Sequence, residues 1–361
     1  MAKTLIGRLF NREKPRRFKA WQIELTTRCP LRCAMCVRQA YKGEGRKDMA
    51  LSDFKKIVPY LKDVENVVLE GWGESLLHKD LVECIELIKK EGARAGFVTS
   101  GAGLNEEYVR RLVRVGLDFI GFSLSGATPE THNRIRVNSD FVKLIESIKL
   151  FRDLTARTRK PRMHIVYLML KENMAEVPLL PDLAKEVGVE EIVLINIIQV
   201  ANKWQAEQKV YGSEDEKQFR EILRKAERKA KRLRLSFVRS SLAPNEVAVC
   251  SEDPLRSLYI SVDGEVSPCV HLYPPVPSPF TRIFRDEEYC VEKVSFGNIF
   301  REPFESIWNR EEYARFRDRV LRRKLKAEQV YKDLLSLKRP EQVGLPEAPS
   351  ACKSCHKMLG V

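Results

Sequence analysis

The hydrophobic pattern of the first 200 residues alternates between two kinds of segment. Short runs of β-branched, aromatic and aliphatic residues, each long enough for a buried parallel strand, occur at 21–25, 66–70, 95–99, 119–124, 163–168 and 191–197. Amphipathic stretches with apolar residues at helical spacing separate them, at 54–61, 81–90, 106–115, 141–154 and 177–187. Strand and helix recurring in this order predict a right-handed parallel βαβ series.

Local signals mark the ends of one of these helices and the start of a further one. Asn105 is a natural N-cap before two glutamates, and Gly116 follows the expected end of the same helix. Thr128 followed by Pro129 has the form of a capped helix start with proline in the first turn. These positions predict helices that begin at 106 and 129.

The repeat stops after Ile197, and we place a domain boundary near 200–240. Ser213 to Glu216 spell a capping box, which predicts a long basic helix reaching about Arg234. The segment 257–270 alternates around Asp263-Gly264, a strong hairpin signal. The remaining expectations are a connector at 201–212, a possible strand at 235–241, a Pro-rich loop at 271–290 and a final helical region at 304–337.

Composition narrows the class of protein. The chain has 361 residues with 43% hydrophobic and 32% charged residues, so it can bury a sizeable core, and disordered and fibrous classes are excluded. Residues 1–20 form a basic N-terminal extension whose short apolar run is broken at Arg8, so it lacks a signal-peptide core. The longest apolar stretches fall far short of a membrane span. We therefore expect a cytoplasmic protein.

The formal net charge of +14 raises the question of a nucleic-acid partner. Acidic residues, Glu216, Glu221 and Glu227, are interspersed along the basic helix, and no aromatic residues interleave with its charges to stack bases. We expect a solvated basic surface and no nucleic-acid partner.

The spacing of the cysteines indicates a metal centre. In a reducing compartment, closely spaced thiols point to metal binding or redox chemistry, and Cys29, Cys33 and Cys36 lie within eight residues directly after a predicted strand. A single loop would present all three to one metal centre. A [4Fe-4S] cluster usually takes four cysteine ligands, so three leave one iron open, whereas a zinc site would need a fourth protein ligand nearby. Cys84, on an apolar helix face, is expected to be a small buried hydrophobe.

The segment 29–36, CPLRCAMC, resembles the signature of the radical S-adenosylmethionine (radical SAM) superfamily. The resemblance implies an α/β fold with a partial (β/α)6 TIM-type barrel at 21–200, which holds a [4Fe-4S] cluster that binds SAM. One electron from such a cluster cleaves SAM to methionine and a 5′-deoxyadenosyl radical, and this radical abstracts hydrogen from the substrate. The chain is thus expected to be an enzyme, supplied with electrons by a donor such as ferredoxin or flavodoxin.

Other positions resemble the SAM-binding motifs of the same superfamily. Trp72-Gly73-Glu74-Ser75 resembles its GGEP motif, whose backbone holds the methionyl amine, although Ser75 stands in place of proline, and Gly71 would share this role. The resemblance places Met35 near the adenine. It also implies polar contacts to the ribose and methionine from Ser123 and Ser125, and a carboxylate partner in Arg136.

The C-terminal part resembles the SPASM or Twitch extension. Cys250, thirteen residues, Gly264, four residues and Cys269 match the opening of that domain. The resemblance implies a smaller α+β domain at 241–361, preceded by a connector and basic helix at 201–240. It would hold one auxiliary [4Fe-4S] cluster, whose ligands would be Cys250, Cys269, Cys352 and Cys355.

Alternatives to this auxiliary site stay open. Cys290 has no place in it. A structural zinc site with four cysteine ligands is an alternative for the same four residues. Cys352 to His356 also match the CxxCH pattern of covalent haem attachment.

The substrate is not encoded in a recognisable motif. By analogy with the superfamily, a peptide or protein is the first choice. A small molecule, tetrapyrrole or metallocofactor precursor is the second, and a non-enzymatic electron-transfer or scaffold protein is the competing class. His164 and Asn196, on the fifth and sixth strands, are candidates either for substrate contacts or for hydrogen-bonded core positions.

Overall fold

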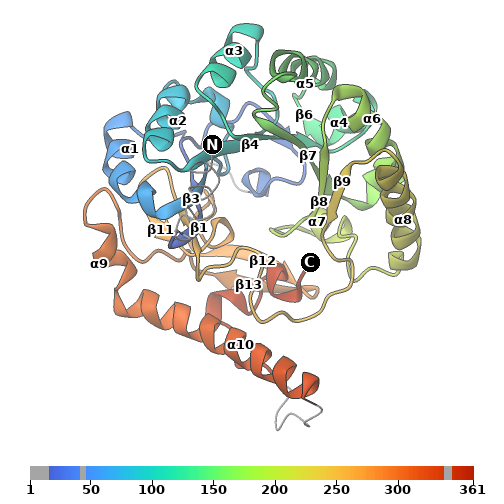
Figure 1. Cartoon of the computed structure of the whole chain (residues 1–361). Coiled ribbons are helices and arrows are strands. Elements are labelled where there is room, and N and C mark those ends of the chain that lie inside the picture. The colour runs from blue at the N-terminus through green and yellow to red at the C-terminus, as the bar shows by residue number, and fades with distance from the viewer. Residues whose placement is uncertain (1–15, 41–45, 337–343) are drawn as a thin grey trace, which may run out of the picture.

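The computed structural model describes residues 16–40, 46–336 and 344–361. Most of the basic extension predicted at 1–20 therefore lies outside the described residues. Six parallel strands form at the predicted places, and helices cover the sheet on its outside (Figure 1). These strands are β1 (Phe18–Ile23), β3 (Val64–Val68), β4 (Arg94–Thr99), β5 (Phe119–Leu124), β7 (Arg162–Met169) and β8 (Glu191–Asn196). The predicted mixed α/β fold with a parallel-strand barrel is confirmed.

The sheet is wider than the six predicted strands. Strand β9 (Ser236–Arg239) pairs in parallel with β8, and β10 (Ser257–Ile260) pairs in parallel with β1, with Trp21 opposite Leu258. The antiparallel β11 (Val266–Ser267) completes a hairpin with β10, as Asp263-Gly264 predicts. Two further pairs lie outside this sheet: the short β2 (Arg32–Cys33) with β6 (Arg136–Val137), and β12 (Phe280–Phe284) with β13 (Glu287–Val291).

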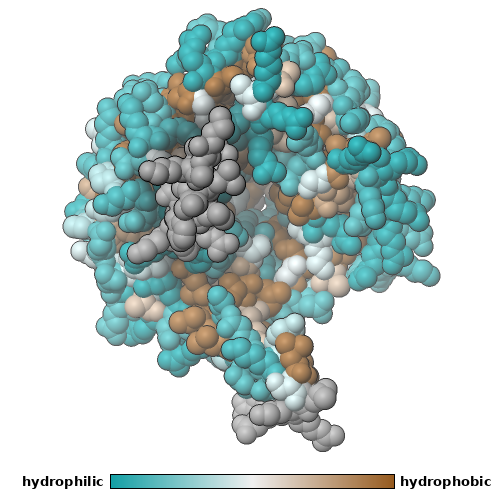
Figure 2. All heavy atoms as spheres, in the orientation of Figure 1, coloured by the Kyte–Doolittle hydropathy of each residue, from teal (hydrophilic) through white to brown (hydrophobic). Residues whose placement is uncertain are grey.

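The outer helices alternate with the strands. They are α1 (Leu51–Ile57), α2 (Leu81–Lys90), α3 (Glu106–Arg114), α4 (Pro129–Ile135), α5 (Phe141–Thr155) and α6 (Leu180–Val187). The chain then adds α7 (Lys203–Glu207), α8 (Glu216–Arg232), α9 (Phe304–Trp308) and α10 (Glu311–Leu335). Mainly hydrophilic residues cover the outer faces of this ring, as amphipathic helices require (Figure 2). No helix in the described ranges is long and apolar enough to cross a bilayer.

One apolar core joins the barrel to the C-terminal part. Phe122 of β5 meets Phe151 of α5 with ring centroids 5.8 Å apart, which fastens sheet to helix. At the other end of the core, Phe18 and Trp21 of β1 contact Trp308 and Phe304 of α9, with centroids at 4.9 and 4.7 Å. Burial of each such side chain contributes about 1.5–3 kcal/mol. The last third of the chain is thus packed against the first strand.

The two predicted caps are confirmed. The side chain of Asn105 accepts the backbone N–H of Tyr108, and that of Thr128 accepts the N–H of Thr131. Gly116 follows α3 with φ of +78°, a conformation that glycine adopts without strain.

Two local predictions are wrong, the capping box and the Pro-rich loop, and the final helical region is confirmed with one interruption. The capping box at Ser213 does not form, because the Ser213 hydroxyl accepts the N–H of Asp215, two residues on, and α8 begins at Glu216 without a side-chain cap. The final helical region is broken after Trp308, where Arg310 is extended and its guanidinium holds Glu302 at 2.5 Å. The expected loop at 271–290 contains most of the β12–β13 hairpin, whose register pairs Thr281 with Cys290.

A buried arginine fixes α10 to the rest of the C-terminal part. The guanidinium of Arg323, 1% exposed, donates to the carbonyls of Ala248, Val247 and Pro346 and to the carboxylate of Glu246. We expect R323K to lower the free energy of unfolding by about 1–2 kcal/mol, because an ammonium keeps the charge but cannot reach four acceptors at once.

Urea unfolding would measure this change. R319K, at an exposed position of the same helix, should change the free energy of unfolding by less than about 0.5 kcal/mol. Equal effects of the two substitutions would contradict the prediction.

Candidate functional site

The three-cysteine loop begins just after β1 and is held by the chain that follows β5. Cys33 lies in β2 opposite Arg136 of β6, and the N–H of Ala34 donates to the carbonyl of Ile135 at 3.0 Å. The N–H of Cys36 donates to the carbonyl of Cys33, also at 3.0 Å, and this turn brings Cys36 back towards Cys33. The thiols of Cys29, Cys33 and Cys36 interact electrostatically with one another, and burial raises the pKa of Cys36 to about 11. The loop therefore gathers three thiols at the carboxyl end of the barrel.

Two residues predicted to contact SAM meet beside this loop. The Nε of Arg136 donates to the hydroxyl of Ser125 at 2.9 Å. Ser125 is fully buried, and its carbonyl accepts the side-chain amide of Asn173 at 3.1 Å. Because β2 and β6 are paired, the backbone of Arg136 is held opposite that of Cys33.

The loop at residues 71–75, which follows β3 and is called the Gly-Glu loop below, packs against the start of the cysteine loop at residues 29–36. The N–H of Glu74 donates to the carbonyl of Arg28 at 2.7 Å. A Cβ on Gly73 would lie 2.1 Å from the carbonyl oxygen of Thr26, and one on Gly71 would lie 2.5 Å from the side chain of Glu24. Only glycine fits this approach, so the two loops are in direct backbone contact.

The Glu74 carboxylate is used to hold its own loop in place. It accepts the hydroxyls of Thr99 and Ser100 at 2.7 and 2.6 Å and the N–H of Ser100 at 2.8 Å. Ser75, which replaces the proline of the resembled motif, donates its hydroxyl to the carbonyl of Leu69 at 2.6 Å. The departure from that motif thus adds a hydrogen bond that fastens the same turn.

Glu24, directly after β1, links this loop to the C-terminal part. One carboxylate oxygen accepts the N–H of Trp72 at 2.8 Å, and the other accepts the N–H of Val262 at 3.4 Å. The carboxylate also interacts electrostatically with Tyr259, and burial raises the pKa of Glu24. Glu24 was not predicted from the sequence, although an acidic residue inside a buried strand was a usable signal.

The structure brings the four C-terminal cysteines together. Cys250 precedes β10, Cys269 follows β11, and Cys352 and Cys355 are joined by a turn in which the Cys355 N–H donates to the Cys352 carbonyl at 3.0 Å. The Cys269 thiol interacts electrostatically with the other three, and burial raises its pKa. By contrast, Cys290 is exposed on β13 and Cys84 is fully buried on α2.

A polar and aromatic bridge lies between the two sets of cysteines. The ring of Trp72, in the Gly-Glu loop, meets that of His271 edge-on at 6.4 Å. Glu252, two residues after Cys250, lies 3.2 Å from the ammonium of Lys357 and 3.8 Å from His271. Burial lowers the pKa of His271 to about 4. The two candidate centres are therefore connected through packed side chains.

The remaining candidates divide between the site and the scaffold. Met35 packs against an apolar cluster that includes Ile135 and Leu359. Ser123 lies on β5, two residues from Gly121, whose missing Cβ leaves room for the ring of His164 on β7. Asn196 donates its side-chain amide to the carbonyl of Ser241 at 2.8 Å, so it fastens the chain after β9.

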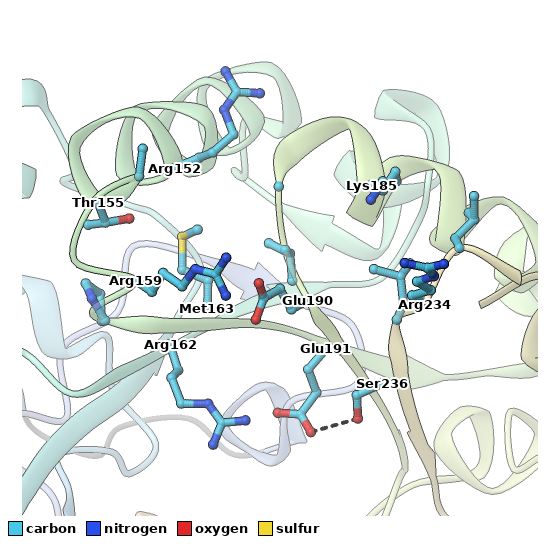
Figure 3. Close-up of a pocket in the computed structure, with 16 residues that line it drawn as sticks. Arg152, Thr155, Arg159, Arg162, Met163, Lys185, Glu190, Glu191, Arg234 and Ser236 are labelled. Carbon is cyan, nitrogen blue, oxygen red and sulfur yellow. Dashed lines mark hydrogen bonds between the residues drawn. The ribbon is translucent and has the colours of Figure 1, made fainter. Parts of the chain in front are cut away.

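A cavity of about 620 Å³ lies at the opposite, amino end of β7, β8 and β9 (Figure 3). Its lining includes five cations: Arg152, Arg159, Arg162, Lys185 and Arg234. Helices α5, α6 and α8 all end there, and cations complement the negative ends of helix dipoles. None of the predicted site residues lines it, so we assign these charges to the scaffold.

Among the residues that the structure describes, no three His, Cys, Asp or Glu side chains are grouped so as to hold a single metal ion. The donor set itself fits iron–sulfur chemistry: three thiols on one loop and four from three segments, each set in mutual electrostatic contact.

Comparison with known proteins agrees with this arrangement. Residues 23–184 match the family model of the radical SAM superfamily, and residues 250–356 match that of the SPASM iron–sulfur cluster-binding domain. The chain is a radical SAM enzyme with a C-terminal SPASM domain. The first domain implies a [4Fe-4S] cluster and SAM, and the second implies auxiliary iron–sulfur binding.

Among its relatives is the tungsten-containing aldehyde ferredoxin oxidoreductase cofactor-modifying protein of Pyrococcus furiosus. The two are 26% identical over 307 residues, which cover 82% of each chain. The structure is also similar to Streptococcus suis SuiB bound to its precursor peptide SuiA, with a TM-score of 0.60 and 14% identity over 95% of this chain and 71% of SuiB. Native anSMEcpe with bound AdoMet and a peptide gives a TM-score of 0.59 and 17% identity over 82% and 81% of the chains.

The close approach at Gly73 yields a prediction. We expect G73A to weaken SAM binding about tenfold or more, because the added methyl group forces the Gly-Glu loop away from the Thr26 carbonyl. Isothermal titration of the reconstituted protein with SAM would measure this. A Cβ added to Gly344 would meet nothing within 4 Å, so G344A should bind SAM as tightly as the unaltered protein does. An unchanged affinity of G73A would contradict the prediction.

Proposed function

We propose that this chain binds its SAM-cleaving [4Fe-4S] cluster through Cys29, Cys33 and Cys36. The observation that carries this proposal is the convergence of the three-thiol loop, the Gly-Glu loop and Arg136 at one edge of the barrel. When bound, the cluster and SAM supply a 5′-deoxyadenosyl radical able to abstract hydrogen from a substrate.

The chain's own residues would bind and orient SAM. The backbone around Gly71, Trp72 and Gly73 is the proposed site of the methionyl amine, and the close packing of Gly73 on the Thr26 carbonyl supports it by holding this backbone beside the cysteine loop. Arg136, whose guanidinium donates to Ser125, is the proposed partner of the SAM carboxylate. The further roles proposed are an adenine contact from Met35, on the cysteine loop, and a polar contact from Ser123.

We propose one auxiliary [4Fe-4S] cluster for the C-terminal part, bound by Cys250, Cys269, Cys352 and Cys355. Their mutual interaction supports this set, and the exposure of Cys290 on a separate hairpin supports its omission. We retain the proposed division into a barrel at 21–200, a connector with the basic helix at 201–240 and an auxiliary domain at 241–361. Ferredoxin or flavodoxin is the proposed class of electron donor. The proposed compartment is the cytoplasm, where thiols stay reduced.

The proposed substrate is a peptide or protein, which the enzyme oxidises or otherwise modifies. Support comes from structural neighbours that hold peptides, SuiB with SuiA and anSMEcpe with its peptide. The alternative is a metallocofactor or other small-molecule precursor. It is favoured by the Pyrococcus furiosus relative, whose name describes a cofactor-modifying protein and whose match covers four fifths of both chains.

Anaerobic turnover tests the proposal. The reconstituted and reduced protein should convert SAM to 5′-deoxyadenosine and methionine. If the fully reconstituted protein does not do so, the non-enzymatic alternative is favoured. Mass spectrometry after incubation with peptides, or with metallocofactor precursors, would distinguish the two substrate classes. Zinc in place of iron at the C-terminal site would contradict the auxiliary cluster.

A further inference from the structure

Arg282 of β12 is one of two arginines that are fully buried in the described chain. Its side chain is 1% exposed, as is that of Arg323. Arg323 has a carboxylate partner, Glu246, at 2.7 Å. The Arg282 guanidinium donates instead to two carbonyls, that of His271 at 2.9 Å and that of Ala351 at 3.2 Å. No acidic side chain among the described residues forms an ion pair with it, and its Nε–H is buried without an acceptor.

Both carbonyls belong to segments that carry cysteines of the proposed auxiliary site. Ala351 directly precedes Cys352, and His271 follows Cys269 by two residues. The Arg282 guanidinium also interacts electrostatically with the thiol of Cys352. Figure 1 shows β12 beside the C-terminal residues, in agreement with the hydrogen bond to Ala351. The β12–β13 hairpin therefore brings a full positive charge to the edge of the four-cysteine site.

A buried guanidinium requires a negative partner. Removing an ion from water is costly, and carbonyl oxygens offset only part of that cost because they bear partial charges. Four cysteine thiolates bound to a [4Fe-4S] core form a cluster of net negative charge. Such a cluster would supply the counter-charge that no carboxylate in the described chain supplies to Arg282.

We propose that Arg282 balances the charge of the auxiliary cluster and thereby raises its reduction potential. The inference rests on the proposed cluster at the four C-terminal cysteines. Reduction adds an electron to the cluster, so a nearby cation stabilises the reduced form more than the oxidised form. Burial strengthens this effect, because charges interact more strongly where water is excluded. Arg282 thus sets how readily the cluster accepts an electron.

A redox titration followed by electron paramagnetic resonance measures this effect. C33A serves as the parent protein, because it lacks a thiol of the other cluster site and leaves the auxiliary cluster to be observed alone. R282Q, which removes the charge, should lower the equilibrium constant for one-electron reduction about tenfold, which is a potential about 59 mV lower. R282K, which keeps the charge, should stay within about threefold of the parent. R285Q, which removes an equal charge from the exposed turn of the same hairpin, should do the same.

Iron analysis and circular dichroism of each variant separate the outcomes. Loss of the auxiliary iron from R282Q but not from R282K would show that the charge is needed to hold the cluster, which supports the proposal. Equal potentials of R282Q and the parent, equal falls in R282Q and R282K, or loss of iron from both variants would overturn it and leave Arg282 as a hydrogen-bonding clamp. If reconstituted C33A holds no iron–sulfur cluster at all, the proposed auxiliary cluster fails, and this inference fails with it.

Discussion

C33A, reconstituted and reduced without oxygen, should form less than about a thousandth of the 5′-deoxyadenosine that the unaltered protein forms. Cys33 is the buried middle member of the three-thiol loop, fixed in β2 opposite Arg136. Alanine offers no ligand, so a cluster would keep only two protein thiols where the chemistry needs three. Chromatographic measurement of 5′-deoxyadenosine against time would give the rate.

Iron analysis separates loss of the cluster from loss of fold. C33A should contain about four fewer irons per chain than the unaltered protein, with unchanged far-ultraviolet circular dichroism. C290A is the matched control, because that thiol is exposed on β13 and belongs to neither set. It should keep both its iron and its rate. A C33A protein that still cleaves SAM would contradict the assignment of the loop.

The second large effect concerns stability and pH. Between pH 5 and 8, the unaltered protein should lose on the order of 3 kcal/mol of unfolding free energy that E70Q does not lose. Burial raises the pKa of Glu70 from its ordinary 4.5 to about 8, so over this interval the folded chain holds a proton that the unfolded chain releases. The contribution of Glu70 to the free energy of unfolding is largest below pH 4.5 and decreases as the pH rises towards 8. Glutamine has no proton to hold, so its contribution does not change.

Urea unfolding at several pH values would measure the difference. The other buried acids are present in both proteins, so their contributions cancel in the comparison. E146Q, on the exposed side of α5, should follow the unaltered protein at every pH. Parallel curves for E70Q and the unaltered protein would show that Glu70 is ionised in the folded state at neutral pH.

Local chemistry explains which parts of the fold could be predicted. The six strands and the caps at Asn105 and Thr128 depend on residues close in sequence, and the structure agrees with them. The parallel pairing of β1 with β10 joins Trp21 to Leu258, and no local pattern encodes a partner that far away. The β12–β13 hairpin was missed because prolines near it indicated a loop, although its own strand residues, Phe280 to Phe284, are largely apolar.

The candidate site also contains residues that the sequence predicts and residues that it does not. Spacing alone predicts the thiol triplet, because a single loop can present three cysteines within eight residues to one metal centre. Glu24 and Glu70 have no such spacing, and their importance emerges only when Val262 and Glu252 arrive from the C-terminal part. The contact of Arg136 with Ser125 is intermediate between these cases: a resemblance named both residues, and the structure adds the hydrogen bond between them.

The position of β10 beside β1 has a consequence for biosynthesis. As the chain leaves the ribosome, the outer edge of its first strand has to wait for more than 230 further residues before its neighbour, Ser257–Ile260, exists. An unpaired strand edge is a template for association with other chains. Nascent chains halted before 257 should therefore be prone to aggregate and to need chaperones, whereas chains that have emerged past 260 can close that edge themselves.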